Sequence, residues 1–82
     1  MPTLIPHAKL ALLLKQDRVV SSARTVGELL DEVARRLPEN EWLAARKATL
    51  LVNGRNVNYL AGQKTALEAD DEVWMVVPSG GG

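Results

Sequence analysis

The chain has 82 residues, with a hydrophobic fraction of 46% and a charged fraction of 24%, which are typical of one small globular domain. Ten basic and ten acidic residues give a formal net charge of zero, which argues against a nucleic-acid partner and gives no reason to expect a membrane surface. The absence of cysteine excludes disulfides and thiolate metal sites, and the single histidine, His7, is too little for a metal site, so we expect no bound metal.

The first third of the chain predicts two short strands. Thr3 to Ile5 lies between two prolines, and Arg18 to Ser21 directly precedes the clearest helix. Between them, the segment from His7 to Gln16 fits a helix and a strand equally well, because its leucines satisfy both periods. No apolar run approaches the ~20 residues of a membrane span and no signal-peptide pattern is visible, so we expect a cytoplasmic protein.

The residues from Thr25 to Leu37 have the strongest helical pattern. Thr25 and Glu28 have the spacing of a capping box, in which each side chain binds the backbone amide of the other residue. Pro38 is expected to end the helix. Apolar residues form one stripe, which we expect to pack on the sheet together with Leu51 and Val73; the stripe is Val26, Leu29, Leu30, Val33, Ala34 and Leu37.

The next segment predicts a hairpin. Ala48 to Val52 is a compact apolar run, and Asn53-Gly54 directly after it is the strongest short signal for a tight turn between two strands. Asn56 to Tyr59 is the candidate return strand. Leu60 to Thr65 contains a glycine and shows no period, so it is predicted to be a loop.

The last predicted strand runs from Glu72 to Val77, after a turn at Asp70-Asp71. Because side chains alternate along a strand, Trp74 and Val76 share one face. The other face, which suits the helical stripe, carries Val73, Met75 and Val77. One helix covers one side of a sheet, so these elements predict an α+β fold with a mixed sheet packed on one main helix.

The C-terminal half contains an ordered set of short motifs: Val52-Asn53-Gly54-Arg55-Asn56-Val57, Thr65-Ala66-Leu67, Asp70-Asp71-Glu72-Val73, Val77-Pro78 and the terminal Gly81-Gly82. In this order the set resembles that of a known family, the ubiquitin-like β-grasp sulfur carriers of the MoaD/ThiS type. The resemblance is to the small subunit of molybdopterin synthase, the thiamine sulfur carrier and the carrier of the thiocarboxylate route to cysteine. It implies a β-grasp domain over residues 1–78 and a flexible tail over residues 79–82 that contains Gly80, Gly81 and Gly82.

The resemblance also implies a function. An E1-like activating enzyme would use ATP to adenylate the carboxylate of Gly82, and a sulfurtransferase or other donor would then supply sulfur to form a thiocarboxylate. A downstream synthase would consume that sulfur for molybdenum or tungsten cofactor, thiamine, cysteine or another metabolite. The chain itself would bind no cofactor and would not be an enzyme, which agrees with the lack of a nucleophile–base pair in the sequence.

Two other functions remain open. The same Gly82 carboxylate could form an isopeptide bond with a lysine, as in a protein modifier, or the domain could be an interaction module with an inert tail. For the partner surface we expect Trp74, because tryptophan is a favoured interface anchor, and Val76 beside it. Tyr59 and Leu60 could extend this surface, and Arg55 could pair with acidic groups of a partner.

Overall fold

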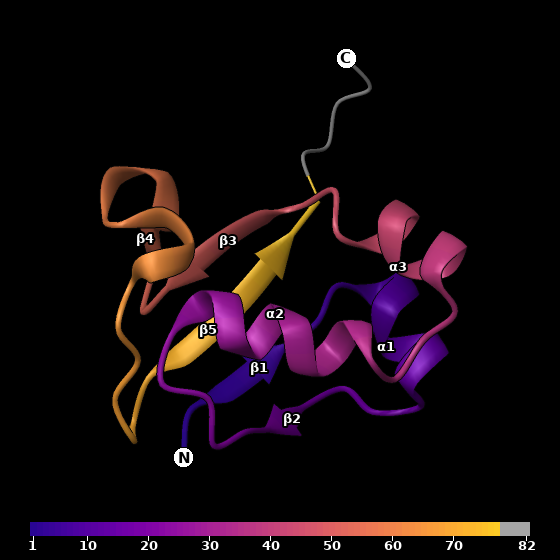
Figure 1. The fold of residues 1–82 in the computed structure, drawn as a ribbon, viewed down its shortest axis with the longest axis horizontal. Coiled ribbons are helices and arrows are strands. Elements are labelled where there is room, and N and C mark those ends of the chain that lie inside the picture. Colours follow the sequence, from indigo (N-terminus) through magenta and orange to yellow (C-terminus); the bar gives the residue numbers. More distant parts are fainter. Residues whose placement is uncertain (78–82) are drawn as a thin grey trace.

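The computed structural model describes residues 1–77, which form one five-stranded sheet with three α-helices and two 3-10 helices (Figure 1). The strands are β1 (Thr3–Ile5), β2 (Val19–Val20), β3 (Thr49–Val52), β4 (Arg55–Asn56) and β5 (Glu72–Val76). The α-helices are α1 (Ala8–Leu14), α2 (Val26–Ala34) and α3 (Glu39–Ala45), and the 3-10 helices are η1 (Val57–Tyr59) and η2 (Gly62–Lys64). The predicted tail of residues 79–82, and Pro78 before it, lie outside the described residues.

The sheet is mixed, as the sequence predicts. Its strand order is β2-β1-β5-β3-β4, and among the described strands only the central neighbours β1 and β5 run parallel. A parallel pair needs a long crossover connection, which the chain between β1 and β5 supplies. This topology places β5, the strand that leads into the tail, between β1 and β3 in the middle of the sheet (Figure 1).

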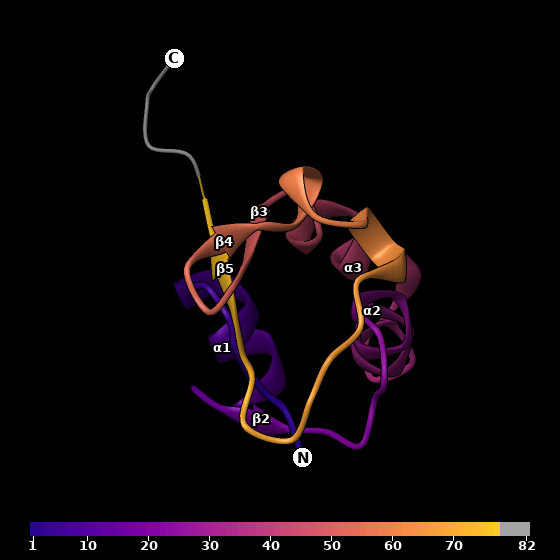
Figure 2. The same cartoon turned by 90° about the vertical axis from the view of Figure 1, so that its left-hand side faces the viewer.

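The hydrophobic core lies between the sheet and α2, which stand on opposite sides of it in Figure 2. Leu30 and Leu37 of the predicted stripe are only partly buried. The predicted core position of Leu51 is wrong, because Leu51 is paired with Trp74 in β5 and paired residues share a face of the sheet. The fully buried apolar side chains are Leu4, Leu10, Val26, Leu29, Val33 and Val73.

The start of α2 follows the predicted cap with one difference. Thr25 Oγ1 accepts a hydrogen bond from the N–H of Glu28 at 3.1 Å. Glu28 Oε1 accepts from the N–H of Arg24 at 2.9 Å, one residue before the amide that a capping box predicts. The helix ends at Ala34 instead of Leu37. The amides of Arg36 and Leu37 bond three residues back instead of four, because Pro38 disfavours the helical conformation of the residue before it.

The segment from His7 to Gln16, for which the sequence leaves helix and strand open, forms α1. His7 caps this helix, since its Nδ1 accepts a hydrogen bond from the N–H of Leu10 at 3.2 Å. Its Nε2 donates to the carbonyl oxygen of Ala45, at the end of α3, at 2.8 Å. Leu10 is fully buried, so both the cap and the core favour the helix.

Two short elements differ from the sequence prediction. α3 is not predicted at all; it buries Trp42 and Ala45 against the core. The predicted return strand from Asn56 to Tyr59 is wrong after its first residue, because β4 ends at Asn56 and the chain turns into η1. There Asn56 Oδ1 accepts from the N–H of Asn58 at 2.8 Å, a local bond that competes with strand pairing.

Candidate partner-binding face

The face of β5 opposite the core carries two exposed apolar side chains. Trp74 is 44% exposed and Val76 is 41% exposed, whereas Val73 before Trp74 and Met75 between the two are buried. This alternation agrees with the sequence prediction for both faces. Val77, predicted on the core side, is 52% exposed, because β5 ends at Val76 and the alternation of buried side chains ends with it.

Neighbouring strands add two more apolar residues to this face. Trp74 is registered against Ile5 of β1 on one side and against Leu51 of β3 on the other. Directly paired residues point to the same face, so these three side chains form a row across the middle of the sheet. Together with Val76 they form the outer patch, which we define as Ile5, Leu51, Trp74 and Val76.

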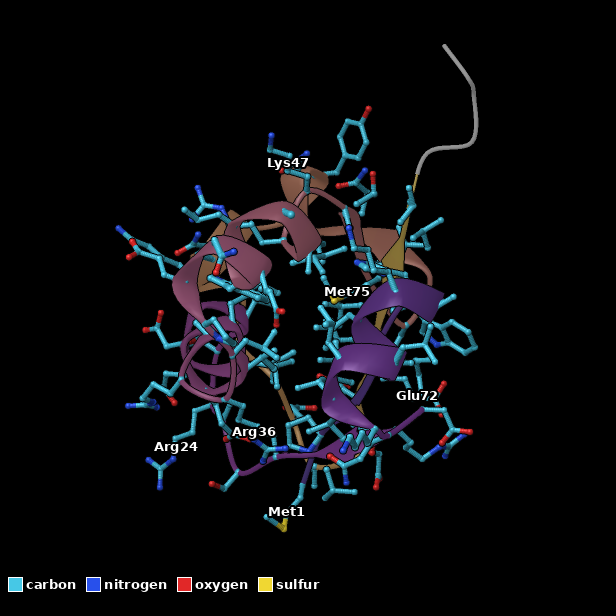
Figure 3. The ribbon with its side chains drawn as sticks, turned by 90° about the vertical axis from the view of Figure 1, so that its right-hand side faces the viewer. Met1, Arg24, Arg36, Lys47, Glu72 and Met75 are labelled. Atoms are coloured by element: carbon cyan, nitrogen blue, oxygen red, sulfur yellow. The ribbon has the colours of Figure 1, made fainter. Side chains whose placement is uncertain are left out.

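The indole of Trp74 is held in place by a neighbour on its own strand. Trp74 Nε1 donates a hydrogen bond to Glu72 Oε1 at 3.2 Å. Residues two apart in a strand lie on the same face, so this bond runs along the surface of the sheet. Figure 3 shows Met75 pointing into the space between the sheet and the helices, with Glu72 on the other side of the sheet. The bond favours one orientation of the aromatic ring on the surface of the sheet.

The other three residues predicted for the partner surface do not lie on the outer patch. Arg55 is paired with Val52, which is buried, so the register places Arg55 on the opposite face from Trp74. Tyr59 is 87% exposed and Leu60 is 40% exposed, but they belong to the segment around η1. In Figure 2 this segment (orange) lies across the end of the molecule toward α2, away from the outer face of β5.

The paired acids Asp70-Asp71 serve the turn before β5. Asp71 Oδ1 accepts from Asn53 Nδ2 and Asp71 Oδ2 accepts from the N–H of Glu68, both at 2.8 Å. Both carboxylate oxygens of Asp71 are therefore used to hold the turn in place.

Within residues 1–77, no group of three or more His, Cys, Asp or Glu side chains is arranged so that it could bind a metal ion. The same part of the chain contains no helix that is long and apolar enough to cross a membrane.

Comparison with protein families gives a match to the family described as "ThiS family" over residues 7–82. The match begins at the cap of α1 and runs through Gly80, Gly81 and Gly82, so it includes the glycine tail. The chain belongs to the ThiS family. This confirms the resemblance to the ubiquitin-like β-grasp family, and it means that the chain is a small protein of the carrier or modifier class and not itself an enzyme.

Solved structures confirm the β-grasp fold of this ThiS-family chain. The small archaeal modifier protein SAMP1 from Methanosarcina acetivorans superimposes with a TM-score of 0.82 at 20% identity, covering 99% of this chain and 95% of that one. A chain of the Amycolatopsis orientalis BexX/CysO complex gives 0.80 at 20% identity, with 100% of both chains covered. The Haloferax volcanii HVO 2177 protein gives 0.72 at 28% identity, covering 99% and 85%. A comparison with curated proteins gives no significant match.

The ThiS-family tail itself, Gly80 to Gly82, lies outside the described residues. The structure nevertheless fixes where the tail begins. Val76 is the last residue of β5 and part of the outer patch, and only Val77 separates it from Pro78. The outer patch therefore extends to within one residue of the end of the described chain.

Proposed function

We propose that this ThiS-family protein is a sulfur carrier whose reactive group is the carboxylate of Gly82. The observation that carries the proposal is the family match, which extends through the terminal glycines. The domain would serve as a handle that a partner recognises, and the tail would carry the chemistry. We expect it to act in the cytoplasm, with an activating enzyme that binds and uses ATP.

The proposed reaction has two steps at the carboxyl carbon. An oxygen of the Gly82 carboxylate attacks the α-phosphate of ATP, and pyrophosphate leaves to give an acyl adenylate. Sulfide then attacks the carboxyl carbon, AMP leaves with its electron pair, and the product is a thiocarboxylate. The persulfide of a sulfurtransferase attacks in the same way but first gives an acyl disulfide, from which a thiol releases the thiocarboxylate by forming a disulfide with the sulfurtransferase. A downstream synthase would use the sulfur of the thiocarboxylate. None of these steps requires a side chain of the carrier.

The composition of the tail suits this chemistry. Pro78 to Gly82 span roughly 15 Å when extended, enough to place the carboxylate in a partner's active site while the domain stays outside. Glycine has no side chain to clash with a narrow channel, and it tolerates backbone conformations that other residues avoid. Pro78 has no N–H to continue the hydrogen bonding of β5, which favours separation of the tail from the sheet.

The outer patch is the proposed binding surface for the activating enzyme. Trp74 is fixed by Glu72 and flanked by Ile5 and Leu51, so it presents a preorganised aromatic anchor. The similar chain in the BexX/CysO crystal structure was solved in a complex, which supports partner binding as the mode of action of this fold. Tyr59, Leu60 and Arg55 would contact such a partner only if it also wraps around the end of the sheet.

A protein modifier is the second candidate. The similarity to SAMP1, whose name describes a modifier, favours it. The two functions share the adenylate and differ in the nucleophile that follows, which is sulfide or persulfide for a carrier and a lysine amine for a modifier.

One experiment separates these functions. The protein is incubated with its activating enzyme, ATP and sulfide, and its intact mass is measured. A sulfur carrier gains the mass difference between sulfur and oxygen, and this gain disappears when ATP is omitted. A modifier instead forms adducts to lysine in added protein substrates. An unchanged mass under all conditions, with neither product, would contradict both proposals and leave an interaction domain with an inert tail.

A further inference from the structure

The turn between β3 and β4 carries a chemically labile pair, Asn53-Gly54. In such a pair the backbone nitrogen of the glycine attacks the side-chain carbonyl carbon of the asparagine. Ammonia leaves, a cyclic succinimide forms, and water opens the ring to aspartate or isoaspartate. Glycine favours the attack because it has no side chain to shield its nitrogen and the backbone is free to move. The other asparagines of the chain, Asn40, Asn56 and Asn58, are followed by Glu41, Val57 and Tyr59.

The turn itself is well formed. Asn53 has φ +50° and Gly54 has φ +87°, which are the left-handed conformations that a two-residue hairpin turn of this type requires. Asparagine and glycine are the residues that adopt these conformations with the least strain. The fold therefore favours the labile pair at this position, and replacing either residue would strain the turn.

The folded protein holds the side chain of Asn53 against β5 instead of against Gly54. Asn53 Nδ2 donates to Asp71 Oδ1 at 2.8 Å, and Asn53 Oδ1 accepts from the N–H of Glu72 at 3.0 Å. The N–H of Asn53 donates to the carbonyl oxygen of Glu72 at 2.9 Å. We call these three hydrogen bonds the clasp. The side-chain carbon of Asn53 has to leave the clasp before it can approach the nitrogen of Gly54.

The acceptor in the clasp is itself held on both sides. Asp71 Oδ2 accepts from the N–H of Glu68 at 2.8 Å, and the carbonyl oxygen of Asp71 accepts from the N–H of Thr3 at 3.0 Å. Asp71 therefore cannot follow the amide of Asn53 outward, so opening the clasp breaks a hydrogen bond to a charged group. Such bonds are among the stronger ones in proteins.

We propose that Asn53 is a site of spontaneous deamidation in this protein, and that opening of the clasp controls the rate of the reaction. While the clasp is closed, both atoms of the amide are engaged and the succinimide cannot form. The reaction needs only water as a co-reactant and involves no oxidation or reduction. The bond between the side-chain carbon and ammonia breaks, and the bond to the nitrogen of Gly54 replaces it until hydrolysis.

The product cannot rebuild the clasp. An aspartate at position 53 would present a carboxylate where Nδ2 donated to Asp71, so that two negative groups would face each other across the 2.8 Å now occupied by a hydrogen bond. An isoaspartate would in addition lengthen the backbone of a two-residue turn by one carbon. Deamidation would thus loosen the start of β5, the strand that carries Trp74 and Val76. It would also change the formal net charge from zero to minus one.

Because deamidation adds one negative charge, the deamidated protein can be separated from the unmodified protein by its charge. The protein is incubated at mildly alkaline pH, natively and in concentrated urea, and the deamidated fraction is separated by anion exchange and located by peptide mass mapping. Folded wild-type protein should deamidate at Asn53 at least about tenfold more slowly than protein in urea, since a lost hydrogen bond to a charged group changes the open population by about that factor. Asp71→Ala removes the acceptor and should raise the native rate by about the same factor.

Asp70→Ala is the matched control, because it removes a neighbouring carboxylate that takes no part in the clasp. It should deamidate at the wild-type rate, and Asp71→Asn, which keeps a neutral acceptor for Asn53, should give a rate between those of wild type and Asp71→Ala. Circular dichroism checks that each variant is folded, and the comparison of native and urea rates remains decisive if Asp71→Ala is not. Equal native and urea rates, equal acceleration by Asp70→Ala and Asp71→Ala, or modification first at another asparagine would each overturn the proposal.

Discussion

Truncation of Trp74 tests the outer patch directly. A tryptophan side chain offers ~150–250 Å² of surface, and 44% of Trp74 is still exposed, so about 100 Å² remains for a partner to cover. At ~25 cal/mol per Å² this corresponds to about 2.5 kcal/mol, or roughly a fifty- to hundredfold change in affinity. Trp74→Ala should therefore weaken binding to the activating enzyme by that factor. By the same measure the buried part of the side chain, about 125 Å², contributes up to about 3 kcal/mol to the free energy of unfolding, so Trp74→Ala should be destabilised by no more than that amount.

The assay is titration calorimetry of each variant with the activating enzyme, together with urea unfolding. Leu43→Ala is the matched control, since Leu43 is also apolar and 43% exposed but lies on α3, which stands on the α2 side of the sheet in Figure 2. Its affinity should stay within about twofold of wild type. Equal losses of affinity for both variants, or a loss for Trp74→Ala that is fully explained by unfolding, would refute the assignment of the outer patch as the binding surface.

Two further predictions concern stability, measured by urea unfolding. Leu29→Ala should lower the free energy of unfolding by about 2–5 kcal/mol because Leu29 is fully buried, whereas Leu12→Ala, at a side chain that is 79% exposed, should change it by less than about 0.5 kcal/mol; similar effects would contradict the core assignment. His7→Ala should cost about 1–2 kcal/mol, because it removes the cap of α1 and the bond to Ala45. His7→Asn should restore the part of this free energy that comes from the cap, since asparagine is a good N-cap. If His7→Asn were as unstable as His7→Ala, the capping role of His7 would be contradicted.

The main helix and the alternation of β5 could be predicted because each is specified by local signals. α2 combines a side-chain cap with a stripe of fully buried residues, and β5 alternates buried and exposed positions over its length. Such patterns state both the type of element and its orientation. Trp74 and Val76 were therefore predicted on a shared face, and the structure confirms that both are exposed.

The phase of β3 could not be predicted, because the run from Ala48 to Val52 is almost entirely apolar. A continuous apolar run has no alternation that tells one face from the other. Only the register against β5 places Leu51 beside Trp74 and leaves Val52 in the core, and the two-residue turn then sets Arg55 on the side of Val52. Leu51 is missed as a member of the outer patch for this reason, and Ile5 is missed because β1, with three residues, is too short to show an alternation.

α3 was missed because its helix signals are weak. Pro38 at its start provides no side-chain cap, and only Trp42 and Ala45 of its seven residues are buried. Helices of this length are not stable alone and depend on tertiary contacts. Here the contacts come from the core and from the bond between His7 and Ala45, which joins residues 38 positions apart and has no local sequence signal.

The central claim is that a partner activates the carboxylate of Gly82, and ATP–pyrophosphate exchange with and without one alanine added after Gly82 tests it most directly. The added residue moves the carboxylate by up to ~3.5 Å and introduces a side-chain carbon at the reacting residue. A displacement of about 1 Å can already cost ~100-fold in rate, so exchange should be nearly abolished while the domain stays folded. Undiminished exchange with the extended protein would contradict this claim, because activation would then not depend on the position of the terminal carboxylate.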